Sequence, residues 1–136
     1  MGYSFFGGNS KVTVATDIGH IRENLIPELT GSDMVLLEAN HDVEMLKAGP
    51  YPYPLKRRIL GERGHLSNES AADLCVQLVK TGTRHILLGH LSQQNNLPEL
   101  AYQTVKQILQ ENGITVDRDV TLSVASRHEH SALFAV

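Results

Sequence analysis

The sequence contains no tryptophan and a single cysteine, Cys75, among its 136 residues. One cysteine cannot form a disulfide within the chain, which is typical of proteins kept in a reducing compartment. No segment approaches the roughly 18 consecutive apolar residues that a membrane-spanning helix requires. Residues 1–8 also lack the basic region and the apolar core of a secretory signal. These absences predict a cytoplasmic protein that does not enter a membrane.

The net charge and the absence of short catalytic motifs exclude several further classes of function. The formal net charge is −3 at pH 7, so the chain has no general affinity for nucleic acid, and binding of a polyanion would need a local patch or a bound metal. The sequence contains neither a Gly-x-Ser-x-Gly nucleophile elbow nor a glycine-rich phosphate-binding loop. A free-standing α/β hydrolase with another mechanism is therefore the poorest interpretation.

Apolar stretches alternate with segments of helical periodicity along most of the chain. Strands are predicted at residues 11–16, 33–37, 84–88, 121–125 and 132–136. Helices are predicted at residues 21–29, 42–48, 56–60, 68–81 and 97–111. Residues 51–54 are predicted to be extended, because each proline disfavours the α conformation in the residue before it. The alternation predicts one α/β domain over residues 1–136, with parallel strands joined by right-handed crossovers.

Polar residues follow three of the predicted strands at the point where each strand ends. Asp17 follows the first strand, Glu38 the second and His90 the third. The carboxyl ends of parallel strands form the ligand crevice of open α/β sheets, so these side chains are expected to meet there. Carboxylate and imidazole groups also bind transition metals. Taken alone, Asp17 could instead cap the next helix, and His90 could be a packed histidine at a strand end.

Five segments together carry the motifs of a known family. In chain order they are residues 15–19 (ATDIG), 37–42 (LEANHD), 49–56 (GPYPYPLK), 63–68 (RGHLSN) and 89–96 (GHLSQQNN). With these motifs the chain resembles the carboxyl-terminal half of a metallo-β-lactamase-fold hydrolase, most closely the YycJ (WalJ)-type exonucleases and more distantly tRNase Z. The resemblance implies an α/β fold that is half of a four-layer αββα sandwich, with one mixed sheet and helices on one face.

The resemblance also implies roles for particular residues. Asp17 matches a carboxylate that bridges two metal ions (Zn, Mn or Fe), and His90 matches a terminal metal ligand. Two such ions activate the water that attacks phosphorus. Glu38 and His65 match a relay in which the carboxylate orients the imidazole and the imidazole protonates the leaving ribose oxygen. A surface carboxylate and a loop imidazole are an equally good interpretation of these two residues.

A basic and aromatic segment follows Gly49. Lys56, Arg57 and Arg58 could clamp phosphate groups, and Tyr51 and Tyr53 could stack on single-stranded bases. A charged run of this kind is more often a solvated helix face.

The principal metal motif of the family, H-x-H-x-D-H, is absent from the sequence. Asp17 and His90 alone are too few for a zinc site, which normally has three or four protein ligands, so we expect weak metal binding or none. The chain is expected to be one part of a longer or split domain, with little or no activity by itself. The sheet face that would pack against the other half should drive homo-oligomerisation. A non-catalytic oligomerisation or binding module with half of the fold is the alternative, so the sequence leaves open whether the chain is an enzyme.

Overall fold

The computed structural model describes residues 2–7, 10–15, 29, 31–60 and 66–125, with the backbone alone for residues 2–7 and 58–60. These residues form one five-stranded sheet in the order β1-β2-β3-β4-β5. Its strands are β1 (Gly2–Gly7), β2 (Ser10–Ala15), β3 (Met34–Glu38), β4 (His85–Gly89) and β5 (Thr121–Val124). The helices are α2 (Val43–Ala48), α3 (Tyr53–Leu60), α4 (Asn68–Lys80) and α5 (Pro98–Glu111).

The sheet is mixed, as the resemblance implies. Strands β2 to β5 are parallel to one another, and β1 runs antiparallel to β2. Strand β1 was not predicted, because a short aromatic stretch followed by two glycines has no alternating pattern to mark it. The four-layer sandwich would need a second sheet, so it stays a prediction.

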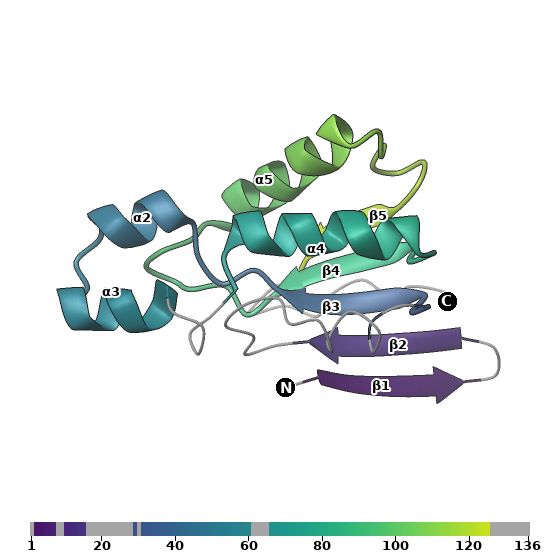
Figure 1. Cartoon of the computed structure of the whole chain (residues 1–136), viewed down its shortest axis with the longest axis horizontal. Coiled ribbons are helices and arrows are strands. Elements are labelled where there is room, and N and C mark those ends of the chain that lie inside the picture. The colour runs from purple at the N-terminus through teal and green to yellow at the C-terminus, as the bar shows by residue number, and fades with distance from the viewer. Residues whose placement is uncertain (1, 8–9, 16–28, 30, 61–65, 126–136) are drawn as a thin grey trace.

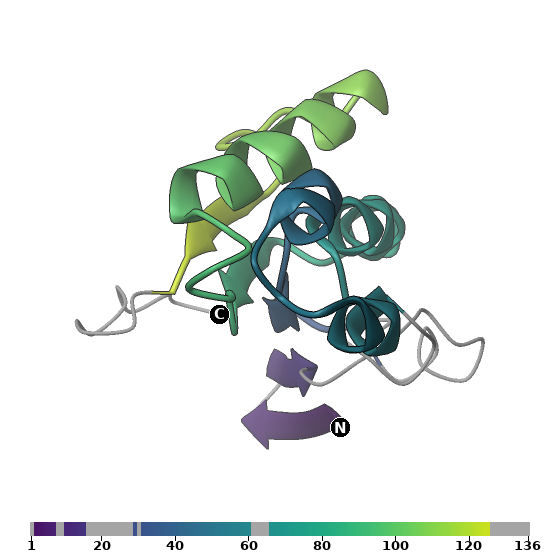
Figure 2. The same ribbon diagram turned by 90° about the vertical axis from the view of Figure 1, so that its left-hand side faces the viewer.

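Helices α4 and α5 lie side by side on one face of the sheet (Figures 1 and 2). The crossovers from β3 to β4 and from β4 to β5 step in the same direction across the sheet. Right-handed crossovers that step in one direction place their helices on the same face. The shorter helices α2 and α3 lie beyond the carboxyl ends of β3 and β4, at the left of Figure 1.

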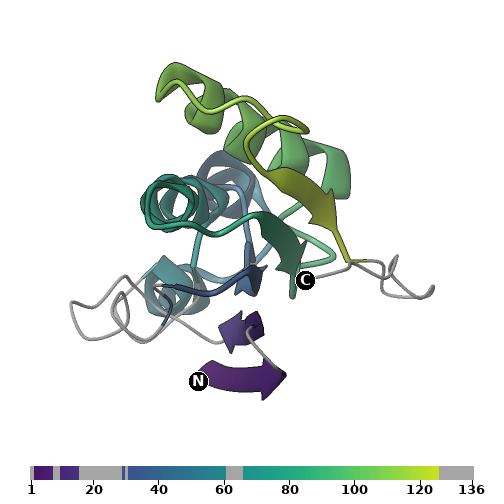
Figure 3. The ribbon, with the colours of Figure 1, turned by 90° about the vertical axis from the view of Figure 1, so that its right-hand side faces the viewer.

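The core lies between this face of the sheet and the two long helices. In β3, Val35 and Leu37 are fully buried, whereas Met34 and Leu36 on the other face are partly exposed. The two strand faces therefore differ, as the period of two in a strand requires. From the helices, α4 contributes Ala71, Leu74, Cys75 and Leu78, and α5 contributes Ala101, Val105 and Leu109. Figure 3 shows the curved sheet with this helical layer on one side.

Most of the predicted elements are present, and one prediction was wrong. Residues 53 and 54 are not extended but are the first two residues of helix α3. A proline is tolerated in the first helical turn, because a backbone amide there has no hydrogen-bond partner within the helix. Residues 21–28 and 132–136, where a helix and a strand are predicted, lie outside the described residues. Within the described ranges, the helices are too short or too polar to cross a lipid bilayer.

Candidate functional site

The carboxyl edge of the parallel strands brings two of the predicted site residues together. Strands β3 and β4 are neighbours, and their register pairs Glu38 with Gly89. His90 follows Gly89 directly, so its side chain lies next to Glu38 although 52 positions separate the two in sequence. The prediction that strand ends gather polar side chains at this edge is therefore confirmed for Glu38 and His90.

Glu38 and His90 form a close carboxylate–imidazole pair. The Nδ1 atom of His90 lies 2.9 Å from the Oε1 atom of Glu38. The Glu38 side chain is fully buried, whereas 46% of the His90 side chain is exposed. A carboxylate only accepts hydrogen bonds, so it fixes the proton of the imidazole on Nδ1 and gives Nε2 the lone pair in the neutral ring. The pair thus presents one defined imidazole nitrogen on the side away from the carboxylate.

The loops around this pair are tied together by backbone hydrogen bonds. The amide of Ala39 donates to the Gly89 carbonyl at 3.0 Å, and the amide of Ser92 donates to the Asn40 carbonyl at 2.7 Å. A third segment joins them, because the Asn40 amide donates to the Leu66 carbonyl at 2.9 Å. The loops after β3 and β4 and the segment before α4 therefore meet at one place.

A reciprocal pair of buried amides links the same three segments. Asn68, at the first position of α4, and Asn96, just before α5, exchange two hydrogen bonds of 2.9 and 2.8 Å. Asn96 also donates to the Ala39 carbonyl and accepts from the Leu97 amide, each at 2.9 Å. The sequence did not predict this pairing, since it depends on contacts between distant segments.

Two further titratable groups near the helices have shifted pKa values. Glu69 lies in the first turn of α4, where burial raises the pKa of its carboxyl group and the nearby Asp42 carboxylate adds to the rise. Burial also raises the pKa of the Cys75 thiol to about 12. A thiol so protonated is no nucleophile at neutral pH, and Cys75 is a buried part of the core.

The other two predicted site residues, Asp17 and His65, lie outside the described residues. The proposed contact between Glu38 and His65 is therefore untested. Leu66, which follows His65 directly, is within the described residues and accepts the Asn40 amide.

The described residues do not make a complete metal site. No group of three or more His, Cys, Asp or Glu side chains within these ranges could hold a metal ion. His90 does have the arrangement that metal-binding histidines usually show, with a carboxylate behind the ring nitrogen that does not bind the metal. His90 could therefore be one ligand of a metal ion, but it cannot form a metal site alone.

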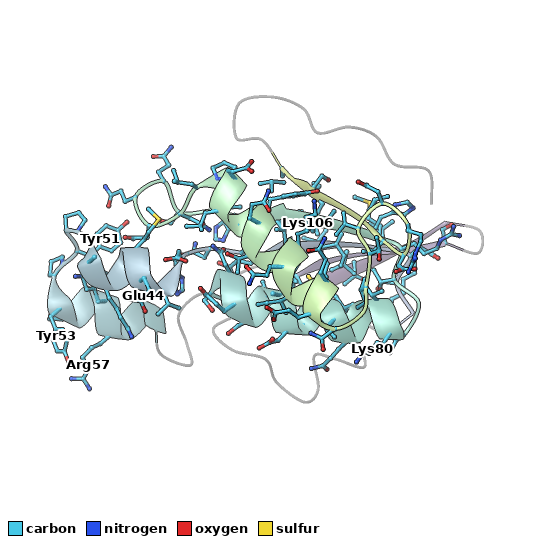
Figure 4. All side chains as sticks on the ribbon, turned by 90° about the horizontal axis from the view of Figure 1, so that it is seen from above. Glu44, Tyr51, Tyr53, Arg57, Lys80 and Lys106 are labelled. Atoms are coloured by element: carbon cyan, nitrogen blue, oxygen red, sulfur yellow. The ribbon has the colours of Figure 1, made fainter. Side chains whose placement is uncertain are left out.

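The predicted phosphate-binding segment lies on α3 and just before it. Tyr53 is 71% exposed, and the Arg57 guanidinium lies 5.9 Å from the centre of its ring. Figure 4 shows Tyr51, Tyr53 and Arg57 at the end of the molecule formed by α2 and α3. Lys56 instead points to α2, where its Nζ donates to the Lys47 carbonyl at 2.6 Å. The side chain of Arg58 is not among those described.

Comparison with known proteins agrees with the motifs. The chain is 42% identical over 116 residues to "Exodeoxyribonuclease YycJ" of Bacillus anthracis, a match that covers 85% of the chain and 44% of that protein. It is 41% identical over 117 residues to "Exodeoxyribonuclease WalJ" of Streptococcus pneumoniae serotype 2 (strain D39), again with 85% and 44% covered. The chain is similar to the YycJ and WalJ exodeoxyribonucleases. The resemblance predicted from its motifs is thereby confirmed.

The match has a limited extent. The chain spans 44% of the length of these YycJ and WalJ relatives. No family model matches the chain.

Proposed function

We propose that this chain forms part of the active site of a hydrolase that cleaves phosphodiester bonds in DNA as an exonuclease. The observation that carries the proposal is the Glu38–His90 pair at the carboxyl edge of the parallel strands. The similarity to the YycJ and WalJ exodeoxyribonucleases over 85% of the chain supports the choice of substrate. The proposal includes that the chain corresponds to the carboxyl-terminal half of the metallo-β-lactamase fold that its motifs resemble.

In this proposal Glu38 acts through the imidazole of His90. Because Oε1 of Glu38 accepts from Nδ1, the Nε2 atom is the one that would bind a metal ion or accept a proton. A divalent metal such as Zn, Mn or Fe would supply an activated water when bound. Asp17 would complete the ligand set together with His90 and further groups. His65 would give its proton to the leaving deoxyribose oxygen, with the Glu38 carboxylate to orient it.

DNA would approach from the end formed by α2 and α3, which lies beyond the same edge of the sheet (Figure 4). Tyr53 is exposed there with Arg57 across its ring, an arrangement suited to a base and its phosphate. Tyr51 and Arg58 would extend this surface, and Lys56 would join it only by leaving the Lys47 carbonyl. Because the net charge of the chain is −3, Arg57 would have to bind phosphate without a general electrostatic attraction between the chain and DNA.

The first experiment measures metal binding and DNA cleavage on the whole chain. Titration calorimetry with Mn²⁺ and Zn²⁺ compares the parent with His90→Gln and Asp17→Asn. His85→Gln is the matched control, because His85 lies on the same strand but at its other end, where its Nδ1 pairs with Thr121 Oγ1 at 2.7 Å. We expect weak metal binding that both site variants abolish and the control retains.

Cleavage of end-labelled single-stranded DNA is followed on the same four proteins. The chain alone should have little activity, and any that is present should fall about 100-fold in His90→Gln and in Asp17→Asn. Activity that survives both substitutions would contradict the roles given to these residues. Equal metal binding by all four proteins would contradict the ligand set.

A second candidate is a non-catalytic module that assembles through the face of the sheet opposite α4 and α5, which no helix among the described residues covers. Met34 and Leu36 point to the face opposite α4 and are partly exposed, so that face offers apolar surface to a second copy. Light scattering of the purified chain tests this candidate. A stable dimer without bound metal would favour it, and a monomer at high concentration would exclude assembly through this face.

A further inference from the structure

Asn40 lies against the backbone of His90 from the neighbouring loop. Its Nδ2 atom donates to the His90 carbonyl at 3.0 Å. Its own carbonyl accepts the Ser92 amide at 2.7 Å, and the preceding Ala39 amide donates to the Gly89 carbonyl at 3.0 Å. Bonds from residues 39 and 40 therefore reach the residue before His90, His90 itself and a residue just after it.

His90 needs such support because its backbone has an uncommon conformation. Its φ angle is +58°, in the left-handed region that a residue with a Cβ atom rarely adopts. In this conformation the imidazole reaches Glu38, with Nδ1 2.9 Å from Oε1. A residue held there must be fixed by its surroundings, since its own backbone preference opposes it.

The Asn40 amide has a second polar neighbour at its oxygen. The Nδ1 atom of His41 lies 3.3 Å from the Oδ1 atom of Asn40, and His41 is only 1% exposed. The Nδ2 atom faces His90. Both polar atoms of the amide therefore have a contact.

We propose that Asn40 is a positioning residue that acts through His90. By its hydrogen bond to the His90 carbonyl it holds the left-handed backbone in which the imidazole Nδ1 meets the Glu38 carboxylate. This inference rests on the proposed function in so far as that function gives His90 a role. The position of the ring, however, can be measured without substrate or metal.

The test reads the proton position on the His90 ring by NMR. Long-range ¹H–¹⁵N correlation spectra at about pH 8, above the ordinary imidazole pKa of ~6.5, distinguish a proton on Nδ1 from one on Nε2. His90→Gln identifies the His90 signals among the 7 histidines of the chain. In the metal-free parent we expect the proton on Nδ1.

Asn40→Asp keeps the shape of the side chain but replaces the donor with an acceptor, so the Nδ1–H signature of His90 should be lost. Asn40→Ala is the second variant, and it adds no charge. Its NMR spectrum is measured if Asn40→Asp does not fold. Ser92→Ala is the matched control, because it removes only the Oγ atom that accepts the Asn95 amide at 3.1 Å in the same loop. The control should retain the signature.

The outcomes separate the inference from the proposed function. An Nδ1–H signature that persists in the folded Asn40 variants but disappears in Glu38→Gln would overturn the positioning role. Equal loss in Ser92→Ala would also overturn it, since the effect would then be general loosening of the loop. Equal metal binding by the parent, His90→Gln, Asp17→Asn and His85→Gln would leave the NMR result intact and count only against the proposed function.

Discussion

The Asn68–Asn96 pair provides the largest stability effect that we can work out from the structure. The Asn96 side chain makes hydrogen bonds to Asn68 (two), Ala39 and Leu97. At about 1 kcal/mol for each buried bond, Asn96→Ala should lower the free energy of unfolding by about 4 kcal/mol. Asn68→Ala loses the two shared bonds and should cost about 2 kcal/mol. Either value is a large share of the ~5–15 kcal/mol typical of a domain.

The double variant decides whether this reasoning is right. Both described side-chain bonds of Asn68 are to Asn96, so Asn68→Ala/Asn96→Ala loses no bond that Asn96→Ala has not already lost. Its total cost should therefore stay near about 4 kcal/mol, which means a coupling of about 2 kcal/mol. Urea unfolding followed by circular dichroism measures each value, provided that the m-values agree. Asn112→Ala, an exposed amide at the end of α5, is the control and should change stability by less than about 0.5 kcal/mol. Additive single effects, or effects no larger than that of the control, would refute the assignment of this pair as a structural link.

Three further predictions concern other parts of the molecule. Gly49→Ala should lower the melting temperature of the chain, because the added Cβ would lie 2.9 Å from both Asn95 Oδ1 and the Met45 carbonyl oxygen. An unchanged melting temperature would show that the loop shifts to accommodate the methyl group. Burial raises the pKa of the Glu69 carboxyl group above 4.5. The contribution of this group to the free energy of unfolding is therefore complete below that pH, where the carboxyl group is protonated. This contribution is lost as the pH rises through the pKa of the folded state. Glu69→Gln should therefore raise the melting temperature near pH 7 more than near about pH 4, and a gain independent of pH would contradict this cause. Cys75, whose pKa is raised to about 12 by burial, should resist iodoacetamide in the folded chain and react after unfolding, as mass spectrometry would show.

Local patterns predicted most of the regular structure. The apolar runs near Val35 and Ile86 predicted two buried strands, and the helical stripe of α4 follows from the period of 3.6 residues. Where local pattern was weak the prediction failed: β1 is held by its pairing with β2, and α3 begins at Tyr53 in spite of the adjacent prolines. Pairing partners and helix starts of this kind depend on context that a short window does not contain.

The candidate site divides in the same way. The sequence predicted that Glu38 and His90 end two strands and face a common edge. It did not predict that they contact one another, and its own pairing of Glu38 with His65 remains untested. The supporting amides Asn40, Asn68 and Asn96 all lie within the family motifs. The sequence did not predict their contacts, since an asparagine in a loop has many ordinary uses.

The sequence by itself determined the α/β class, the order of the main elements and the family that the chain resembles, because periodicity and short motifs are properties of neighbouring residues. Only the tertiary structure decided that Glu38 lies beside His90, through the register that pairs Glu38 with Gly89. It also decided that the amides of Asn68 and Asn96 meet in the interior. Such contacts join residues 28 and 52 positions apart, and they arise only when the packing of strands and helices fixes the loops that connect them.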